Sequence, residues 1–327
     1  MAMIALRYDL RVPSFSTSTP AAQYAACLEQ CAWGDTRGSV DLVVVSEHHG
    51  VDDGYLPAPL TLAAAIAGRT RRVMINIAAL LVPLHDPVRL AEQLAVLDLV
   101  SGGRIVVVAG LGYRNEEFEM AGVERKRRGS LMEEAIEVMR QAWTGEPFEW
   151  RGRQVRVTPR PATPGGPTLL VGGSTEKAAR RAARLRCGFF PAIGDPRLAD
   201  VYREECARVG FGGGFVSLPS GPGFVHVSDD PERDWARIAP YALHDARAYA
   251  AWQTPDQRSS VHVEGATLDA VRASGVYRIV TPDECVALAA ELPTIVLHPL
   301  MGGMPPELGW ESLERFAAEV LPRIRPA

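Results

Sequence analysis

Lysine, paired cysteines and long apolar runs are scarce or missing in this chain of 327 residues. Lys126 and Lys177 are the only lysines among 35 basic residues, and the net charge of −4 argues against a nucleic-acid or anionic-membrane partner. No secretory or membrane-spanning segment appears, so we expect a cytoplasmic protein. The five cysteines stand at positions 27, 31, 187, 206 and 285, without metal spacing, and fit a reducing compartment.

Several common catalytic motifs are also absent. No G-x-G-x-x-G follows the first predicted strand, and no G-x-x-x-x-G-K-[ST] occurs, which argues against a dinucleotide-binding sheet and a nucleotide-hydrolysing P-loop. The lack of G-x-S-x-G removes a serine nucleophile elbow. A metal hydrolase would want closely spaced histidines with a carboxylate, but the first strand ends in Arg7-Tyr8-Asp9, so we predict no metal site.

Unbroken apolar segments alternate with amphipathic ones about eight times. Such runs are typical of parallel strands that are covered on both faces. We predict one domain over residues 1–327, an α/β (β/α)8 TIM barrel with an insertion at about 210–280. The predicted strands are 3–6, 41–45, 72–81, 105–109, 168–171, 188–191, 224–227 and 294–298. The main predicted helices are 21–33, 60–69, 88–100, 128–144, 175–185, 198–209, 231–251 and 308–321.

Polar side chains directly follow the second predicted strand. His48 and His49 stand where a barrel strand gives way to a loop, and an imidazole there can act as acid or base near neutral pH. Successive residues of an extended chain point apart, so we expect only one of them to face the pocket. Glu47 either orients that imidazole or holds the loop as a structural carboxylate. The alternative for both histidines is local hydrogen bonding without catalysis.

Small residues mark two further positions at the ends of predicted strands. Ala78 and Ala79 contribute little packing, so either a neighbouring backbone or a flat ligand lies against them. Gly172-Gly173-Ser174-Thr175 lies between a strand and a helix, where free amides and hydroxyls suit a phosphate. A glycine before an ordinary Ser/Thr helix cap gives the same pattern, and the sequence leaves both interpretations open.

An ordered series of motifs resembles the bacterial luciferase-like monooxygenase family. The resemblance is good over roughly residues 1–195 and looser in the last helix; each motif alone is weak, whereas the order is specific. The motifs are Ser46-Glu47-His48-His49, Pro57-Ala-Pro59, Ala67-Gly-Arg69-Thr70, Pro83-Leu-His85-Asp-Pro87, Arg89-Leu-Ala-Glu92, Leu97-Asp98, Ser101-Gly-Gly-Arg104, Gly112-Tyr113 with Glu117-Phe118, the segment Ala135–Trp143, Val171-Gly-Gly-Ser174 and Ala178–Leu185.

The resemblance implies a TIM-type barrel that binds reduced FMN or, in a sister branch, the deazaflavin coenzyme F-420. It implies a monooxygenase that uses reduced flavin and oxygen on a small, carbonyl-type substrate, with a separate flavin reductase and a homodimeric assembly. His48 matches the catalytic histidine of the family's Glu-His-His motif, whose first residue here is Glu47. Ala78-Ala79 matches a non-prolyl cis peptide beside the flavin ring, and Gly173, Ser174 and Thr175 match the phosphate-binding turn.

One position departs from the family pattern. Members that hold the flavin phosphate commonly carry an arginine between two glycines after the fourth strand, whereas this chain has Leu111 between Gly110 and Gly112. The missing guanidinium removes a contact worth about 1.5–3 kcal/mol. Arg114 is near in sequence, but a regular strand register points it elsewhere. Two alternatives to the monooxygenase therefore stay open: an F-420-dependent hydride-transfer oxidoreductase and a non-catalytic flavin-binding barrel.

Two further expectations concern the pocket walls and the core. We predict that Gln253–Gly275 and Met301–Pro306 close an apolar, adaptable pocket. Cys27 and Cys31, four residues apart on one predicted helix, are expected to face the core.

Overall fold

The computed structural model describes residues 1–253, 257 and 259–325. They form two compact units. The first unit comprises Met1–Val44, Val51–Leu56 and Ser220–Ala327, and the second comprises Val45–Gly50 and Pro57–Pro219. In both units parallel strands alternate with helices, as the apolar segments of the sequence predict.

The sheet of the first unit is entirely parallel. β1 (Met3–Tyr8) pairs with β11 (Thr294–Leu297), β11 pairs with β9 (Phe224–Val227), and β9 pairs with β10 (Tyr277–Val280). β2 (Leu42–Val45) follows β1 in the strand order and ends at the boundary of the unit. β10 is not among the strands predicted from the sequence, because its four residues directly precede the helix start at Thr281.

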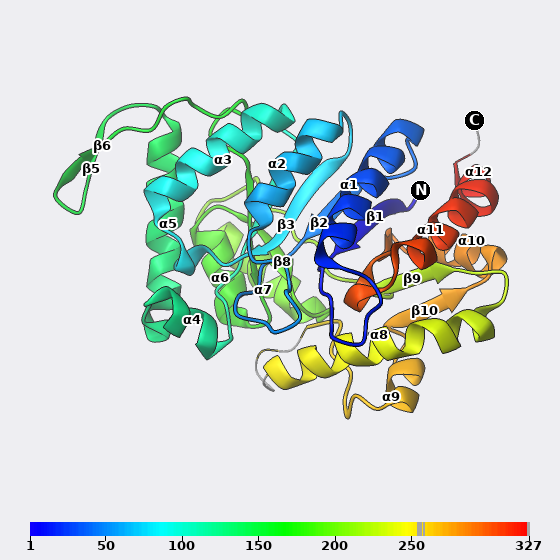
Figure 1. Ribbon diagram of the computed structural model, residues 1–327. Coiled ribbons are helices and arrows are strands. Elements are labelled where there is room, and N and C mark those ends of the chain that lie inside the picture. Colours follow the sequence, from blue (N-terminus) through cyan, green and yellow to red (C-terminus); the bar gives the residue numbers. More distant parts are fainter. Residues whose placement is uncertain (254–256, 258, 326–327) are drawn as a thin grey trace. The chain divides into compact units, whose positions relative to one another are not determined.

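Helix caps in the first unit follow the local sequence. Thr19 accepts a hydrogen bond from the Ala22 amide and Pro20 starts α1, while Thr281 and Glu284 form a reciprocal capping box at α10. The helical segments of this unit are α1 (Pro20–Arg37), α8 (Pro231–Trp252), α9 (Leu268–Ala273), α10 (Pro282–Glu291), η3 (Met301–Gly303), α11 (Pro306–Arg315), η4 (Phe316–Val320) and α12 (Leu321–Ile324). Figure 1 labels many of these elements and colours the chain from blue at the N-terminus to red at the C-terminus.

The second unit contains four neighbouring parallel strands in the order β3 (Met74–Leu80), β4 (Ile105–Ala109), β7 (Thr168–Gly173) and β8 (Gly188–Pro191). Because parallel strands share one direction, their carboxyl ends meet at one edge of the sheet. The register pairs Ala109 with Val171, which brings the residues after β4 and the last residues of β7 to that edge.

The helices of the second unit include three that pack in series, with α3 contacting both α2 and α5. A hairpin is formed by β5 (Phe148–Trp150) and β6 (Arg153–Val155), and Figure 1 shows it at the outer side of this unit. Trp150 and Arg151 attach it to Glu134 of the long helix before it. The helical segments are α2 (Pro59–Arg69), η1 (Val82–Leu84), α3 (Pro87–Ser101), α4 (Asn115–Ala121), η2 (Arg125–Arg127), α5 (Arg128–Trp143), α6 (Glu176–Arg184) and α7 (Pro196–Arg208).

The core of the first unit differs in part from what the sequence suggests. Cys27 and Cys31 are buried, as predicted. Met301 and Met304 are also fully buried, in a hydrophobic cluster with α8, rather than lining an open pocket. The predicted loop Gln253–Gly275 contains α9, and positions 254–256 and 258 of it lie outside the described residues. Among the described residues, no helix has both the length and the apolar character needed to span a bilayer.

Candidate functional site

The residues after β2 hold the end of β3 in the second unit. The peptide bond between Ala78 and Ala79 is cis. The Ser46 hydroxyl donates to the Ala78 carbonyl oxygen at 2.7 Å, and the Glu47 amide donates to the Ala79 carbonyl oxygen at 3.3 Å. Both carbonyls of the cis pair are therefore bound by the first two residues of the Ser-Glu-His-His segment.

The Glu47 carboxylate is the centre of a buried hydrogen-bond group. It accepts from the Leu81 amide at 2.5 Å, and one of its oxygens lies 2.8 Å from His49 Nε2 and 2.9 Å from His85 Nε2. Burial by itself raises the pKa of Glu47, but the hydrogen bonds from His49 and His85 outweigh burial and bring the pKa to about 2. The same carboxylate raises the pKa of His49.

His48 belongs to a different group of side chains. Its Nδ1 lies 2.8 Å from Glu117 Oε1, and its Nε2 lies 3.2 Å from the Tyr113 hydroxyl. The His48 side chain is 8 % exposed and that of Glu117 is fully buried. His48 and His49 thus point to different partners, as the alternation of an extended chain predicts. Of the two roles considered for Glu47, the contacts are those of a loop-holding carboxylate, because Glu117 rather than Glu47 orients His48.

Arg114 supports the same group from the β4 side. Its Nη1 donates to the His49 carbonyl oxygen at 2.7 Å and lies 3.5 Å from Glu117 Oε1. The Arg114 side chain is 9 % exposed. The guanidinium therefore helps to hold the His48–His49 segment through Nη1. Leu111, at the position of the missing arginine, carries no charge.

The glycines at the carboxyl edge of the sheet have packing reasons of their own. A Cβ on Gly110 would lie 2.7 Å from the Ala79 side chain, and a Cβ on Gly173 would lie 2.5 Å from that of Ala178. Gly112 has φ +72°, a conformation that favours glycine. Gly110 is thus brought directly against the cis pair, whereas Gly173 is required by its approach to α6.

The turn after β7 has the features of a capped helix start. Thr175 caps α6 by accepting a hydrogen bond from the Ala178 amide at 3.3 Å, while Ser174 and Gly173 remain partly exposed. Glu176 in the first helical turn pairs with Arg197 and Arg180. A capped helix start with partly exposed backbone is compatible with both interpretations of the motif.

The end of β3 combines buried and partly exposed apolar residues. Ile75, Ile77 and Leu80 are fully buried, whereas Ala78 and Ala79 are partly exposed. The methyl groups of the cis pair are therefore the accessible apolar part of this end of the strand.

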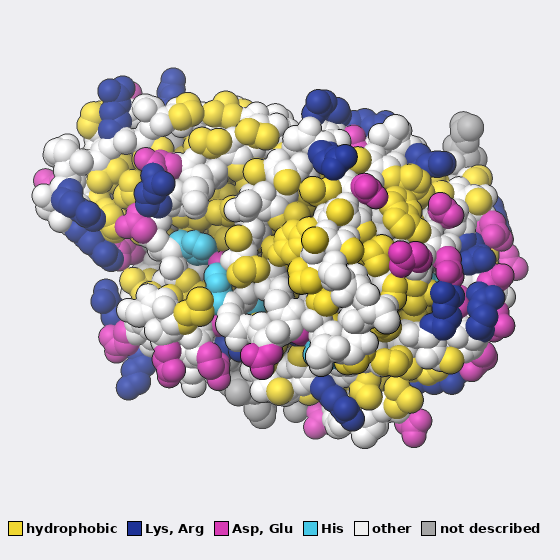
Figure 2. Space-filling model, in the orientation of Figure 1, with side chains coloured by type: hydrophobic (Ala, Val, Ile, Leu, Met, Phe, Trp, Pro, Cys, Tyr) yellow, Lys and Arg dark blue, Asp and Glu magenta, His cyan; other side chains and the backbone are white. Residues whose placement is uncertain are grey.

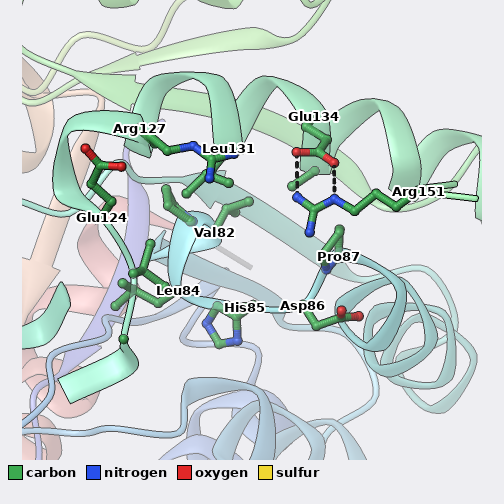
Figure 3. Close-up of a pocket in the computed structure, with 14 residues that line it drawn as sticks. Val82, Leu84, His85, Asp86, Pro87, Glu124, Arg127, Leu131, Glu134 and Arg151 are labelled. Atoms are coloured by element: carbon green, nitrogen blue, oxygen red, sulfur yellow. Dashed lines mark hydrogen bonds and ion pairs between the residues drawn. The ribbon is translucent and has the colours of Figure 1, made fainter. Parts of the chain in front are cut away.

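A pocket of about 280 Å³ opens beside η1 in the second unit. Figure 3 shows Arg127 and the Glu134–Arg151 ion pair facing Val82 and His85 across it. Neither the cis pair nor His48 lines this pocket. His85 connects it to the site, since its Nε2 also contacts Glu47. On the face shown in Figure 2, histidine side chains (cyan) reach the surface.

The first unit holds a second buried polar cluster, centred on Arg11. The guanidinium lies 2.9 Å from Asp53 and 2.8 Å from Asp245, and the Arg11 side chain is fully buried. The central carbon of the guanidinium, Cζ, lies 5.0 Å from the ring centres of both Tyr55 and Trp252. The Tyr277 hydroxyl donates to the second oxygen of Asp245 at 2.7 Å. No cluster of the described residues has the ligand set of a metal ion.

Tyr113 and Glu117 are functional candidates that sequence reasoning did not single out. Both occur in the motif series, but no role follows from their local pattern. Glu117 occupies the first turn of α4, where an acidic residue is ordinary because it complements the helix dipole. Only the contact with His48, 69 residues away in sequence, distinguishes it.

Comparison with known proteins identifies the family. The sequence model of the luciferase-like monooxygenases matches residues 15–292. An uncharacterized protein of Mycobacterium tuberculosis is 34 % identical over 140 residues, which cover 41 % of this chain and 48 % of that protein. The F420-dependent glucose-6-phosphate dehydrogenase of Nakamurella multipartita is 30 % identical over 176 residues, which cover 47 % and 51 % of the two chains. The chain thus spans about half the length of the curated relatives it matches.

Solved structures match over the whole chain. The monooxygenase RslO1 from Streptomyces bottropensis is 25 % identical with a TM-score of 0.74, covering 99 % of this chain and 100 % of that one. The oxygenating constituent of 3,6-diketocamphane monooxygenase from Pseudomonas putida, in complex with FMN, is 19 % identical with a TM-score of 0.71 and 99 % coverage of both. With its parallel strands, its alternating helices and a family match over most of its length, the chain belongs to the luciferase-like monooxygenase family and has that family's α/β TIM-barrel-type fold.

Proposed function

We propose that this chain is a flavin-dependent monooxygenase that uses reduced FMN and oxygen on a small, carbonyl-type organic substrate. The observation that carries the proposal is the presence, in one unit, of the partly exposed cis pair Ala78–Ala79 and of the Glu117–His48–Tyr113 group, in which His48 and Glu117 are buried. The similarity to RslO1 and to the FMN-bound diketocamphane enzyme supports the same class. Reduced flavin, when bound, supplies two electrons to oxygen, one atom of which enters the substrate while the other leaves as water.

The residues of the second unit have separate tasks in this proposal. Ala78 and Ala79 hold the ring, while Gly173, Ser174 and Thr175 hold the phosphate through amides and hydroxyls. Gly110 and Gly112 let the backbone pass close to the ring surface. His48 holds or releases a proton at the carboxyl edge of the sheet. Glu47 acts indirectly, because its carboxylate holds the loop whose residues bind the cis pair.

The assembly follows from the same proposal. In this proposal a separate reductase delivers the reduced FMN. Two copies of the chain form a homodimer in the cytoplasm. Size measurement in solution tests the second statement, and it fails if the protein elutes as a monomer over a wide concentration range.

The decisive test is binding and oxygen consumption. We expect purified protein to bind reduced FMN at micromolar concentration and to consume oxygen in the presence of a matching ketone or aldehyde. The His48→Ala variant should bind FMN equally and lose turnover. No binding of FMN at tens of micromolar refutes the assignment.

A specific observation favours a second candidate, an F-420-dependent hydride-transfer oxidoreductase. Leu111 lacks the guanidinium and Arg114 is committed to His49 and Glu117, so the phosphate end has no arginine from this segment. The similarity to the F420-dependent dehydrogenase of Nakamurella supports the same candidate. Parallel titrations with FMN and coenzyme F-420 separate the two. A non-catalytic barrel remains the third option, and unchanged rates after His48→Ala would identify it.

A further inference from the structure

Both ring nitrogens of His48 are already engaged within the second unit. Nδ1 contacts Glu117 at 2.8 Å and Nε2 contacts the Tyr113 hydroxyl at 3.2 Å. The two rings meet edge to face, with centroids 5.5 Å apart and an interplanar angle of 66°. With 8 % of its side chain exposed, His48 has no nitrogen left to face a ligand directly.

The hydrogen on each nitrogen of His48 follows from the other contacts of Glu117. Its Oε1 also accepts from the His49 amide at 3.1 Å and lies 3.5 Å from the Arg114 guanidinium, both obligate donors. That oxygen is therefore an acceptor, and Nδ1 must carry the hydrogen toward it. Nε2 of the neutral ring then presents its lone pair, to which the Tyr113 hydroxyl donates.

The Tyr113 hydroxyl is placed to act between His48 and the edge of the sheet. Tyr113 follows Gly112, whose positive φ turns the chain after β4, and its side chain is partly exposed where that of His48 is nearly covered. A phenolic oxygen can both donate and accept a proton. Tyr113 is thus the more exposed member of its contact with His48.

We propose that Tyr113 is a catalytic residue that relays a proton between a bound ligand and His48. This inference rests on the proposed function, in which protons must be exchanged. When the ligand gives up a proton, a new O–H bond forms at Tyr113, the old O–H bond breaks, and that hydrogen binds Nε2. The imidazolium gains one positive charge, which Glu117 stabilises, and no electrons are transferred. Donation to a ligand runs in the reverse order.

The competing explanation is that Tyr113 only positions the ring of His48. Tyr113→Phe keeps the aromatic contact and removes the relay, so it separates the two. Tyr202→Phe is the matched control, because it also removes one tyrosine hydroxyl bond in the same unit, to the Cys187 carbonyl oxygen at 2.8 Å, away from His48.

The first measurement needs no cofactor. In the full chain labelled with ¹⁵N-histidine, with His48 assigned by His48→Asn, we expect a protonated Nδ1 and an unprotonated, hydrogen-bonded Nε2. Tyr113→Phe should move the Nε2 resonance and leave Nδ1 protonated, whereas Tyr202→Phe should move neither. If Tyr113→Phe leaves the Nε2 resonance unchanged, the relay is overturned, whether or not flavin binds. A failure of the relay can therefore be told apart from a failure of the proposed function.

The second measurement is the rate at which oxygen oxidises bound reduced FMN, which requires no organic substrate. We expect Tyr113→Phe to lower this rate 10- to 100-fold with unchanged FMN affinity. In mixtures of H2O and D2O the wild type should show two protons in motion, and Tyr113→Phe one. A rate within twofold of wild type, or an unchanged isotope effect and pH profile, overturns the relay and leaves Tyr113 a positioning residue.

Discussion

The two buried polar clusters of this protein contain similar side chains but differ in whether their central group can change its charge. Around Arg11 in the first unit, a guanidinium that never loses its charge neutralises Asp53 and Asp245. Around His48 in the second unit, the central group is an imidazole, and the nearest guanidinium is 3.5 Å from Glu117. A permanent cation fixes the charge of its surroundings, whereas an imidazole lets it change near neutral pH.

The comparison also distinguishes two kinds of buried carboxylate. Burial raises the pKa of Asp9, with Arg11 lowering and Asp245 raising it, to a final value of about 6. Glu47 is as deeply buried, yet its imidazole partners bring its pKa to about 2. Burial alone therefore does not predict the charge of a carboxyl group; the donors around it do.

Replacing His48 by Asn is expected to have the largest effect on rate. The substitution removes the group that holds the proton, so turnover with reduced cofactor should fall 10²- to 10⁴-fold. The free energy of unfolding should change by only about 1–2 kcal/mol, because Asn retains a polar contact. Steady-state kinetics and urea unfolding measure the two quantities. A variant that keeps turnover within fivefold of wild type contradicts the catalytic role.

Replacing Arg11 by Ala should show the opposite pattern. Removing the cation leaves Asp53 and Asp245 buried without their shared partner, and we expect a loss of about 3–5 kcal/mol in the free energy of unfolding. Arg272→Ala, which removes an exposed ion pair to Glu232 in the same unit, should leave stability almost unchanged. Urea titration of both variants decides the matter. A loss below about 1 kcal/mol for Arg11→Ala would break the distinction between the clusters.

The free energy of unfolding should depend on pH differently at the two buried carboxyl groups, and the larger dependence is expected at Glu47. A carboxyl whose folded pKa is depressed adds stability above its unfolded pKa, and this is lost as the pH falls toward the folded value of about 2. Between about pH 4.5 and 2, the stability advantage of wild type over Glu47→Gln should shrink by about 1.4 kcal/mol per unit. Urea unfolding at several pH values measures it, and a constant difference refutes the buried charge.

Asp9 should give a smaller dependence of opposite sign. Its folded pKa of about 6 is raised, so it contributes stability below its unfolded pKa, and this is lost as the pH rises toward 6. Between about pH 4 and 6, wild type should lose stability relative to Asp9→Asn by at most about 1.4 kcal/mol per unit. The same unfolding series on both proteins tests it. Parallel curves would mean that Asp9 is ionised throughout.

Local sequence determined most of the elements. Apolar runs and the caps at Thr19 and Thr281 depend on interactions within a few residues, so most strands and helices follow from the sequence. The order of motifs likewise identifies the family and the positions of His48 and the Ala78–Ala79 pair. Where a short strand directly precedes a helix cap, as β10 does at Thr281, the local pattern predicts only the helix.

The tertiary structure alone decided which side chains meet. Glu47 neighbours His48 in sequence, yet His48 binds Glu117, and Glu47 binds His85, 38 residues on. Strand register indicated only that Arg114 points away from the position of the missing arginine, and its contact shows that Nη1 binds the His49 carbonyl oxygen. The reason is physical: periodicity and caps reflect short-range geometry, whereas hydrogen-bond partners in a barrel depend on how distant strand ends converge at one edge.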